Sequence, residues 1–196
     1  MSLAAKIEKR FSYNDYLTWL DGERWELIDG VAYNMTPAPS FKHQRIAGNF
    51  YRILGNKLSG KSCIPGISPI DVVLSEFDVV QPDVLVVCDK NKITTANIQG
   101  APDLVVEILS PSTAIKDKRE KKALYERYGV REYILIDPTE NYVERFVLRD
   151  GLYGVPDIFG PQEILPLNSL EGIEIPLWEV FEVEAPNAGI KENNNP

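Results

Sequence analysis

The chain has 196 residues, the length of one ordinary globular domain, and 44% of them are hydrophobic. Its 13 Gly and 14 Pro are close to average usage, and two cysteines are too few for a disulfide scaffold, so collagen-like, low-complexity and disulfide-rich classes are excluded. Lys and Arg number 21 against 29 Asp and Glu. The resulting net charge of -8 argues against loose, sequence-independent binding of nucleic acid.

Neither a membrane nor a secretory route is indicated by the sequence. No apolar run approaches the ~20 residues that span a bilayer, and the first ten residues lack the apolar stretch of a signal peptide. We expect Cys63 and Cys88 to be reduced thiols of a cytoplasmic protein. Residues 1–184 are expected to form a single domain, and the polar segment 185–196 a disordered tail.

The first third of the chain predicts a short helix, a hairpin and a long helix. Ser12 can cap a helix that runs to Leu20, and strands at 24–28 and 31–35 flank the turn signal Asp29-Gly30. A second helix begins after Ser40 and ends near Gly60. Its apolar positions recur at helical spacing: Ile46, Phe50, Ile53, Leu54 and Leu58.

The rest of the chain predicts a buried sheet with a further helix. Segments rich in Val, Ile and Leu predict strands at residues 70–74, 79–87 and 104–109. Helical spacing returns over residues 117–128, and further strands follow at 132–136 and 142–148. Pro176 starts a short helix that packs back on the sheet. This order of elements predicts a mixed α/β (α+β) fold without internal repeats.

Two carboxylates interrupt the predicted strands. Glu107 lies among apolar neighbours, and a buried carboxylate needs a cation, a donor or a proton. Asp83 follows Pro82 at a strand entrance, and the connection 88–103 can bring the two acids side by side. Such oxygen ligands suit Mg²⁺ or Mn²⁺ better than Zn²⁺. In the competing interpretation, Asp83 caps a turn and Glu107 pairs with a Lys or Arg.

The helix at 117–128 carries a second group of candidate residues. Asp117, Lys121 and Tyr125 follow i, i+4 spacing, so one helical face presents a carboxylate, an ammonium and a phenol that could close over Glu107. The neighbouring residues Lys118, Arg119 and Lys122 either form a solvent-exposed helix face or bind phosphate.

Positive charge is concentrated in two segments. Residues 116–131 hold seven Lys or Arg against three acids, and residues 36–70 hold five Lys or Arg and no acid. These segments are either ordinary helix surfaces or a nucleic-acid contact. The candidate phosphate-binding residues are Lys42, Arg45, Lys118, Arg119 and Lys122.

Two further residues have open roles. His43, the single histidine, lies beside Gln44 in the first turn of the predicted second helix; it either makes an ordinary hydrogen bond or steers water or phosphate at the site. Glu26, in the first hairpin, either faces solvent or completes the same pocket.

Six strings in order resemble one known family. They are Trp25-Glu-Leu-Ile-Asp-Gly30, Pro37-Ala-Pro-Ser40 with His43-Gln44, Gln81-Pro-Asp-Val84, Val106-Glu-Ile-Leu-Ser-Pro-Ser-Thr113, the Asp117, Lys121, Tyr125 spacing, and Glu132-Tyr-Ile-Leu-Ile-Asp137. From about Tyr13 to Phe181 the chain resembles the Uma-two family of restriction-endonuclease-like proteins. This family is abundant in cyanobacteria and belongs to the PD-(D/E)xK nuclease superfamily. The resemblance implies a restriction-endonuclease-like αβββαβ core with an added N-terminal hairpin, and divalent-metal phosphodiesterase chemistry, without identifying a substrate. We expect a metal-dependent endonuclease that acts on DNA.

The resemblance also implies roles for individual residues. Pro82-Asp83 resembles the superfamily's proline–aspartate element, and Glu107 its second acid; together with the backbone carbonyl of Ile108 they would hold Mg²⁺ or Mn²⁺. Leu109 stands where the superfamily pattern has a lysine, and Lys121 matches the family's lysine. Lys121 would stabilise negative charge in the transition state. Residues that would complete or support the site are Glu26, His43, Asp117, Tyr125 and Gln44.

Three points stay open. Leu109 and the acidic balance favour a rival interpretation, a catalytically inactive nuclease-fold protein that binds or regulates partners. The same residues would also suit RNA or a small phosphoester. Cutting both strands of a duplex requires two sites, so a twofold homodimer is a further expectation.

Overall fold

The computed structural model describes residues 9–19, 24–35 and 38–186. Leu20 of the first predicted helix and residues 187–196 of the predicted tail lie outside the described residues, and the single-domain boundary at 184 stays a prediction. The helical segments are α1 (Tyr13–Tyr16), α2 (Phe41–Leu58), η1 (Lys90–Lys92), α3 (Ala114–Lys116), η2 (Asp117–Lys121), α4 (Lys122–Arg127) and α5 (Leu177–Phe181). The strands are β1 (Trp25–Ile28), β2 (Val31–Asn34), β3 (Ile64–Ile67), β4 (Val72–Ser75), β5 (Asp78–Val80), β6 (Val84–Val87), β7 (Ile98–Gln99), β8 (Leu104–Ile108), β9 (Glu132–Asp137), β10 (Tyr142–Arg149), β11 (Leu152–Tyr153), β12 (Asp157–Phe159), β13 (Ile164–Leu167) and β14 (Ile173–Pro176).

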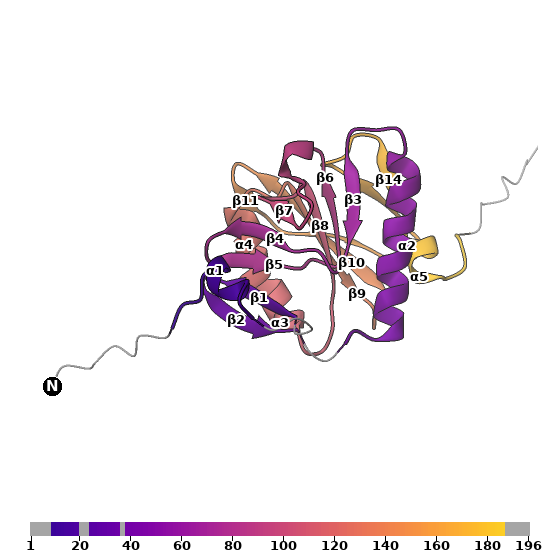
Figure 1. Ribbon diagram of the computed structural model, residues 1–196. Coiled ribbons are helices and arrows are strands. Elements are labelled where there is room, and N and C mark those ends of the chain that lie inside the picture. The colour runs from indigo at the N-terminus through magenta and orange to yellow at the C-terminus, as the bar shows by residue number, and fades with distance from the viewer. Residues whose placement is uncertain (1–8, 20–23, 36–37, 187–196) are drawn as a thin grey trace, which may run out of the picture.

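The strands form two main sheets and one separate pair (Figure 1). The larger sheet has the order β11-β10-β9-β8-β6-β3, with β12 also paired to β10. It is mixed, because β8 and β9 run parallel whereas β6 and β8 run antiparallel. The smaller sheet has the order β2-β1-β5-β4-β7, and β13 pairs with β14. The predicted α+β class with a mixed central sheet is confirmed.

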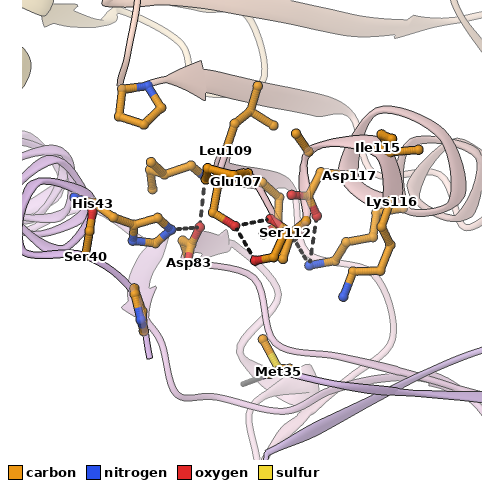
Figure 2. A pocket seen from close by; sticks show the side chains of 18 of the residues that line it. Met35, Ser40, His43, Asp83, Glu107, Leu109, Ser112, Ile115, Lys116 and Asp117 are labelled. Carbon is orange, nitrogen blue, oxygen red and sulfur yellow. Dashed lines mark hydrogen bonds and ion pairs between the residues drawn. The ribbon is translucent and has the colours of Figure 1, made fainter. Parts of the chain in front are cut away.

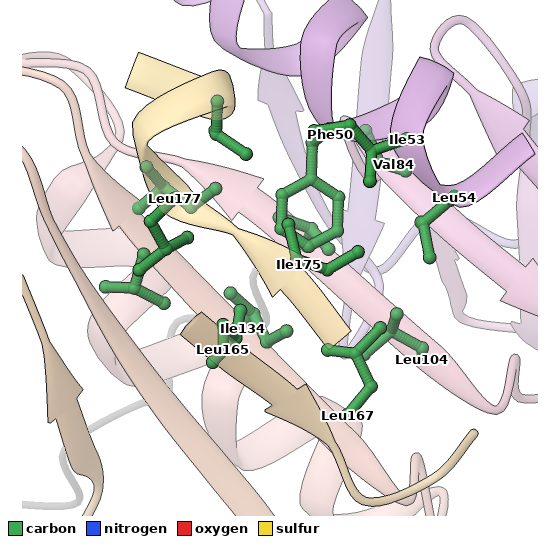
Figure 3. Close-up of a cluster of buried hydrophobic side chains, with 14 of the residues drawn as sticks. Phe50, Ile53, Leu54, Val84, Leu104, Ile134, Leu165, Leu167, Ile175 and Leu177 are labelled. Carbon is green, nitrogen blue, oxygen red and sulfur yellow. The ribbon is translucent and has the colours of Figure 1, made fainter. Parts of the chain in front are cut away.

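Both faces of the larger sheet are covered. Helix α2 lies along one face together with β13, β14 and α5 (Figure 1), and Figure 3 shows Phe50 of α2 among side chains from these elements. The opposite face packs against α4 and the smaller sheet, with Val105 of β8 in the same cluster as Leu124 and Val72. The apolar positions predicted for α2 are all buried: Ile46, Phe50, Ile53, Leu54 and Leu58. The larger sheet is therefore a rigid layer between two hydrophobic cores.

Local signals near the N-terminus are also confirmed. The Ser12 side chain caps α1, although α1 ends at Tyr16. Asp29 and Gly30 adopt positive φ angles of 52° and 77°, the conformation that a tight hairpin turn between β1 and β2 requires. Ser40 caps α2 by accepting the His43 backbone N–H at 3.2 Å.

The prediction of one continuous strand over residues 79–87 is wrong. The segment divides into β5 and β6, which belong to different sheets, with Gln81-Pro82-Asp83 between them. Pro82 has no N–H to donate to a ladder, so the chain leaves the smaller sheet here and enters the larger one. The break has a functional consequence, because it places Asp83 at the end of β6 beside β8.

Edge strand β3 escaped prediction because Pro65 and Gly66 interrupt its pattern; a proline is tolerated there since β3 pairs only with β6. The β13–β14 pair was also missed. Cys63 precedes β3 and Cys88 follows β6, and the two are joined in a disulfide. This bond differs from the reduced thiols that we expected. The cytoplasmic location stays a prediction.

No helix of the described residues combines the length and the apolar character that a membrane-spanning segment needs.

Candidate active site

Asp83 and Glu107 lie side by side at one end of two neighbouring strands. Strands β6 and β8 are antiparallel, and Val84 pairs with Val106. Asp83, which precedes Val84, therefore lies opposite Glu107, which follows Val106. The Ile108 N–H donates a hydrogen bond to Asp83 Oδ2 at 2.8 Å. Figure 2 shows the two acids together in one pocket. Two acids 24 positions apart in the sequence thus lie side by side, as the sequence predicts. We call this pair, Asp83 and Glu107, the acidic floor of the site.

Glu107 is buried and has two partners. Its Oε1 lies 2.7 Å from Lys121 Nζ and accepts the Tyr125 hydroxyl at 2.7 Å. Burial raises the pKa of Glu107 to about 8, helped by the nearby carboxylates of Asp117 and Asp83 and opposed by the Lys121 ammonium. The carboxyl therefore holds its proton close to neutral pH.

Lys121 is the central cation of the site and is only 2% exposed. Its Nζ lies 2.7 Å from Glu107 Oε1, 2.8 Å from Glu26 Oε1 and 3.8 Å from Asp117 Oδ1. Burial alone would lower the pKa of Lys121, but Glu107 and Glu26 raise it well above its usual range. The ammonium therefore stays charged.

The helix that carries Lys121 has a π turn at η2. Asp117, Lys121 and Tyr125 are all buried on one face, as their spacing predicts. The Tyr133 hydroxyl donates to the Asp117 backbone carbonyl at 3.1 Å, within the turn. Leu109, directly after β8, continues the face of the strand that carries Glu107, and the ammonium beside Glu107 comes from the covering helix, through Lys121.

Glu26 belongs to the site rather than to the solvent-facing surface. It is fully buried, and its carboxylate contacts Lys116 Nζ at 2.6 Å and Lys121 Nζ at 2.8 Å. It also accepts the Gln81 backbone N–H at 3.0 Å. Burial would raise the pKa of Glu26, but Lys121 and Lys116 lower it to about 2. Glu26 is therefore a permanent anion that holds both lysines.

Sequence reasoning missed Lys116 and Gln81 as site residues. Gln81 is buried, and its side chain accepts Arg24 Nε at 2.9 Å and donates to Asp71 Oδ1 at 2.8 Å. These bonds fix the chain directly before Asp83. The sequence held a partial signal for Lys116, its place in the basic run, but none for the contact with Glu26.

His43 contacts the acidic floor from α2. It is 6% exposed, and its Nε2 lies 3.2 Å from Asp83 Oδ2 (Figure 2). Burial would lower the pKa of His43, but Asp83 and the Ile108 backbone carbonyl raise it. Its Nδ1 and Asp117 Oδ1 are buried without a hydrogen-bond partner in the described residues. Burial also raises the pKa of Asp117.

These side chains line a cleft of about 1190 Å³. Lys42 and Lys118 of the predicted phosphate-binding set also line it. Four other expected residues do not line the cleft. Arg45 pairs with Glu182, and Lys122 Nζ lies 4.6 Å from the centre of the Phe146 ring. Arg119 and Gln44 are exposed to solvent outside the cleft. Helical spacing turns these four away from the acids, so only part of the predicted charge faces the site.

The oxygen atoms of the site fit a hard divalent ion. The described residues contain no group of three or more His, Cys, Asp or Glu side chains that could hold a metal. Mg²⁺, however, is usually held by one or two carboxylates, with water and substrate phosphate completing its shell. Asp83 and Glu107 supply that number, and Asp117 Oδ1, which has an ion pair with Lys121 but no hydrogen bond in the described residues, is a further buried oxygen of the cleft. The donor set fits Mg²⁺ or Mn²⁺.

Comparison with known proteins identifies the family. Residues 13–178 match the Uma2 family, described as putative restriction endonuclease. The chain belongs to this family. It is 30% identical to the uncharacterized protein slr1290 of Synechocystis over 145 residues, 72% of this chain and 76% of that protein. It is 31% identical to Synechocystis sll1609, also uncharacterized, over 129 residues, 63% of this chain and 72% of that protein.

A solved structure shares the fold. A crystal structure of a putative nuclease belonging to DUF820 from Anabaena variabilis superposes with a TM-score of 0.73. The match covers 88% of this chain and 98% of that one, at 18% identity. The restriction-endonuclease-like fold that the sequence implies is thereby confirmed.

Acid should remove the stabilisation that Glu26 provides. The pKa of Glu26 falls from 4.5 to about 2 on folding, so its contribution is present above pH 4.5 and is lost as the pH falls through 2. We expect the wild type to exceed Glu26→Gln by about 3 kcal/mol in free energy of unfolding at pH 6, and the gap to close towards pH 2. Urea unfolding over this range measures it.

The matched control is Glu174→Gln, which changes an exposed carboxylate on β14. It should change the free energy of unfolding little at any pH. A gap between the wild type and Glu26→Gln that does not vary with pH would show that the contacts of Glu26 with the two lysines do not determine its pKa.

Proposed function

We propose that the chain is a divalent-metal-dependent nuclease that hydrolyses phosphodiester bonds in DNA. The observation that carries the proposal is the convergence of Asp83, Glu107 and Lys121 in one cleft. Membership of a family described as putative restriction endonuclease supports the reaction class. So does the shared fold with a putative nuclease, although the fold alone does not define chemistry.

Asp83 and Glu107, with the Ile108 carbonyl, would hold Mg²⁺ or Mn²⁺. When bound, the ion supplies a Lewis acid that polarises a phosphodiester and lowers the pKa of a water molecule. The Lys121 ammonium, fixed beside Glu107, stabilises negative charge that builds on the phosphoryl oxygens. His43 Nε2, beside Asp83, is placed to hold or move a proton at the mouth of the site.

The surrounding residues position these groups. Glu26 holds Lys121 and Lys116, and it also anchors the Gln81 backbone. Tyr125 orients the Glu107 carboxylate. Because these partners are buried, apart from the partly exposed Lys116, the site keeps its geometry before substrate binds, which is the condition for electrostatic stabilisation of a transition state.

A rival function follows from one observation. Leu109 departs from the superfamily pattern, and Lys121 already contacts three carboxylates, so its charge is partly compensated. A nuclease-fold protein that binds nucleic acid or a regulatory partner without turnover would be compatible with this. Such a protein would not cleave DNA under any metal condition. A homodimer, which would present two clefts to a duplex, stays a prediction.

Removal of either acid should abolish cleavage. We expect Glu107→Gln and Asp83→Asn to lower kcat on DNA oligonucleotides with Mn²⁺ by about 100-fold or more, because each change removes a metal-binding oxygen anion. Glu174→Gln serves as the matched control and should cleave like the wild type. Equal rates in the wild type and both acid variants would contradict the proposal, and so would a wild type without any cleavage.

Metal affinity should depend on pH through Glu107. Its pKa of about 8 means that an ion binding below pH 8 displaces a proton. We expect the Mn²⁺ affinity of the wild type to rise by up to about tenfold per pH unit between pH 6 and 8. Calorimetric titration at pH 6, 7 and 8 measures it. Glu107→Gln has no such proton and should show a flatter dependence; parallel curves would contradict the assignment.

A further inference from the structure

The cleft differs in charge from what a duplex-binding groove requires. Six acids and five Lys or Arg residues line it in the described part of the chain. A protein that grips duplex DNA typically makes ~6–10 phosphate contacts with Lys and Arg. The cleft therefore lacks the surplus of cations that would hold two phosphate backbones.

The cations that are present already have partners. Arg24 contacts Gln81 and Ser68, Lys42 contacts Asn141, Lys116 contacts Glu26, Lys118 contacts Glu144, and Lys121 contacts Glu26 and Glu107. Binding phosphates would break or share these bonds. Contacts between these cations and the phosphates of DNA can thus supply only a small part of the binding free energy. The remaining binding free energy must come from contacts with other parts of the substrate.

Apolar side chains line the same cleft beside the acids. Tyr33 lies in β2 and Met35 directly follows that strand, so at strand spacing they share a face. The centre of the Tyr33 ring lies 5.3 Å from Lys116 Nζ, so this ring already has a partner. Ile115 of α3 is 69% exposed and also lines the cleft. Figure 2 shows Met35 and Ile115 on either side of the carboxylates. A single exposed aliphatic residue needs no explanation on an open surface, but in the cleft Ile115 and Met35 are placed to contact a ligand that reaches the acids.

We propose that the cleft takes an unpaired DNA strand and that Met35 and Ile115 hold the base beside the phosphate at the acids. A base that is stacked and paired in a duplex cannot present its face to such residues, whereas an unpaired base can. The cleft volume, about 1190 Å³, slightly exceeds the ~300–1,000 Å³ of sites for drug-sized ligands, which suits a short length of single strand. This inference rests on the proposed nuclease function and names its substrate class.

The test compares cleavage of one labelled oligonucleotide, single-stranded or annealed to its complement, with Mn²⁺. We expect kcat/KM to be at least about tenfold higher for the single strand, because the unpaired base adds contact that the duplex cannot provide. Equal or faster cleavage of the duplex overturns the inference and leaves the nuclease function intact. Absence of cleavage on both substrates overturns the nuclease function as well.

A matched pair of variants locates the contact. Ile115→Ser should raise KM for the single strand about fivefold with little change in kcat, because it removes apolar contact with the base. Ile158→Ser changes an isoleucine that is 58% exposed on β12, outside the cleft lining, and should leave KM unchanged. If Ile115→Ser and Ile158→Ser behave alike, the proposed contact is wrong.

An abasic substrate separates contact with the base from contact with the backbone. Removing the base beside the scissile phosphate should raise KM for the wild type about fivefold, and it should make the wild type and Ile115→Ser equal, since both then lack the same contact. Additive losses from the variant and the abasic site would overturn the assignment of Ile115 to the base.

Discussion

The buried ammonium of Lys121 is the interaction on which the site depends. Three carboxylates, those of Glu107, Glu26 and Asp117, lie around it in an interior that excludes water. Burial already raises the pKa of Glu107 and Asp117, and without a cation at their centre all three acids would be harder still to keep charged in the interior. The ammonium makes their burial tolerable, and the acids in turn keep it charged and fixed in place. The same group is the one that the proposed chemistry uses.

Two irregularities of the backbone place the acids and the ammonium together. The break at Pro82 moves the chain from the smaller sheet to the larger one and leaves Asp83 opposite Glu107. The π turn of η2 lies in the helix that turns Lys121 towards the sheet. Irregular backbone at a functional site is common, because regular elements rarely aim side chains from three directions at one point. Here β8 keeps regular registers with β6 and β9, and this sheet supplies the rigidity.

Much of this arrangement could be predicted from the sequence where the physical signal is local. Glu107 stands out because its neighbours are apolar, and the spacing of Asp117, Lys121 and Tyr125 defines one face whatever the helix packs against. The juxtaposition of Asp83 and Glu107 was also predicted, but other contacts between distant segments were beyond reach. Nothing in the residues around Lys116 reveals that Glu26 lies 2.6 Å away, and counting charges by segment could not show that Arg45 faces Glu182. Charge within a segment says little about which face of a helix carries it.

The central claim, that Asp83 and Glu107 jointly bind a divalent ion, is tested most directly by anomalous diffraction from a crystal soaked in Mn²⁺. The account predicts one anomalous peak between the two carboxylates, in the cleft beside Lys121, and its loss in Glu107→Gln. A crystal with no peak at these residues, or with manganese bound only at other surface carboxylates, would contradict it.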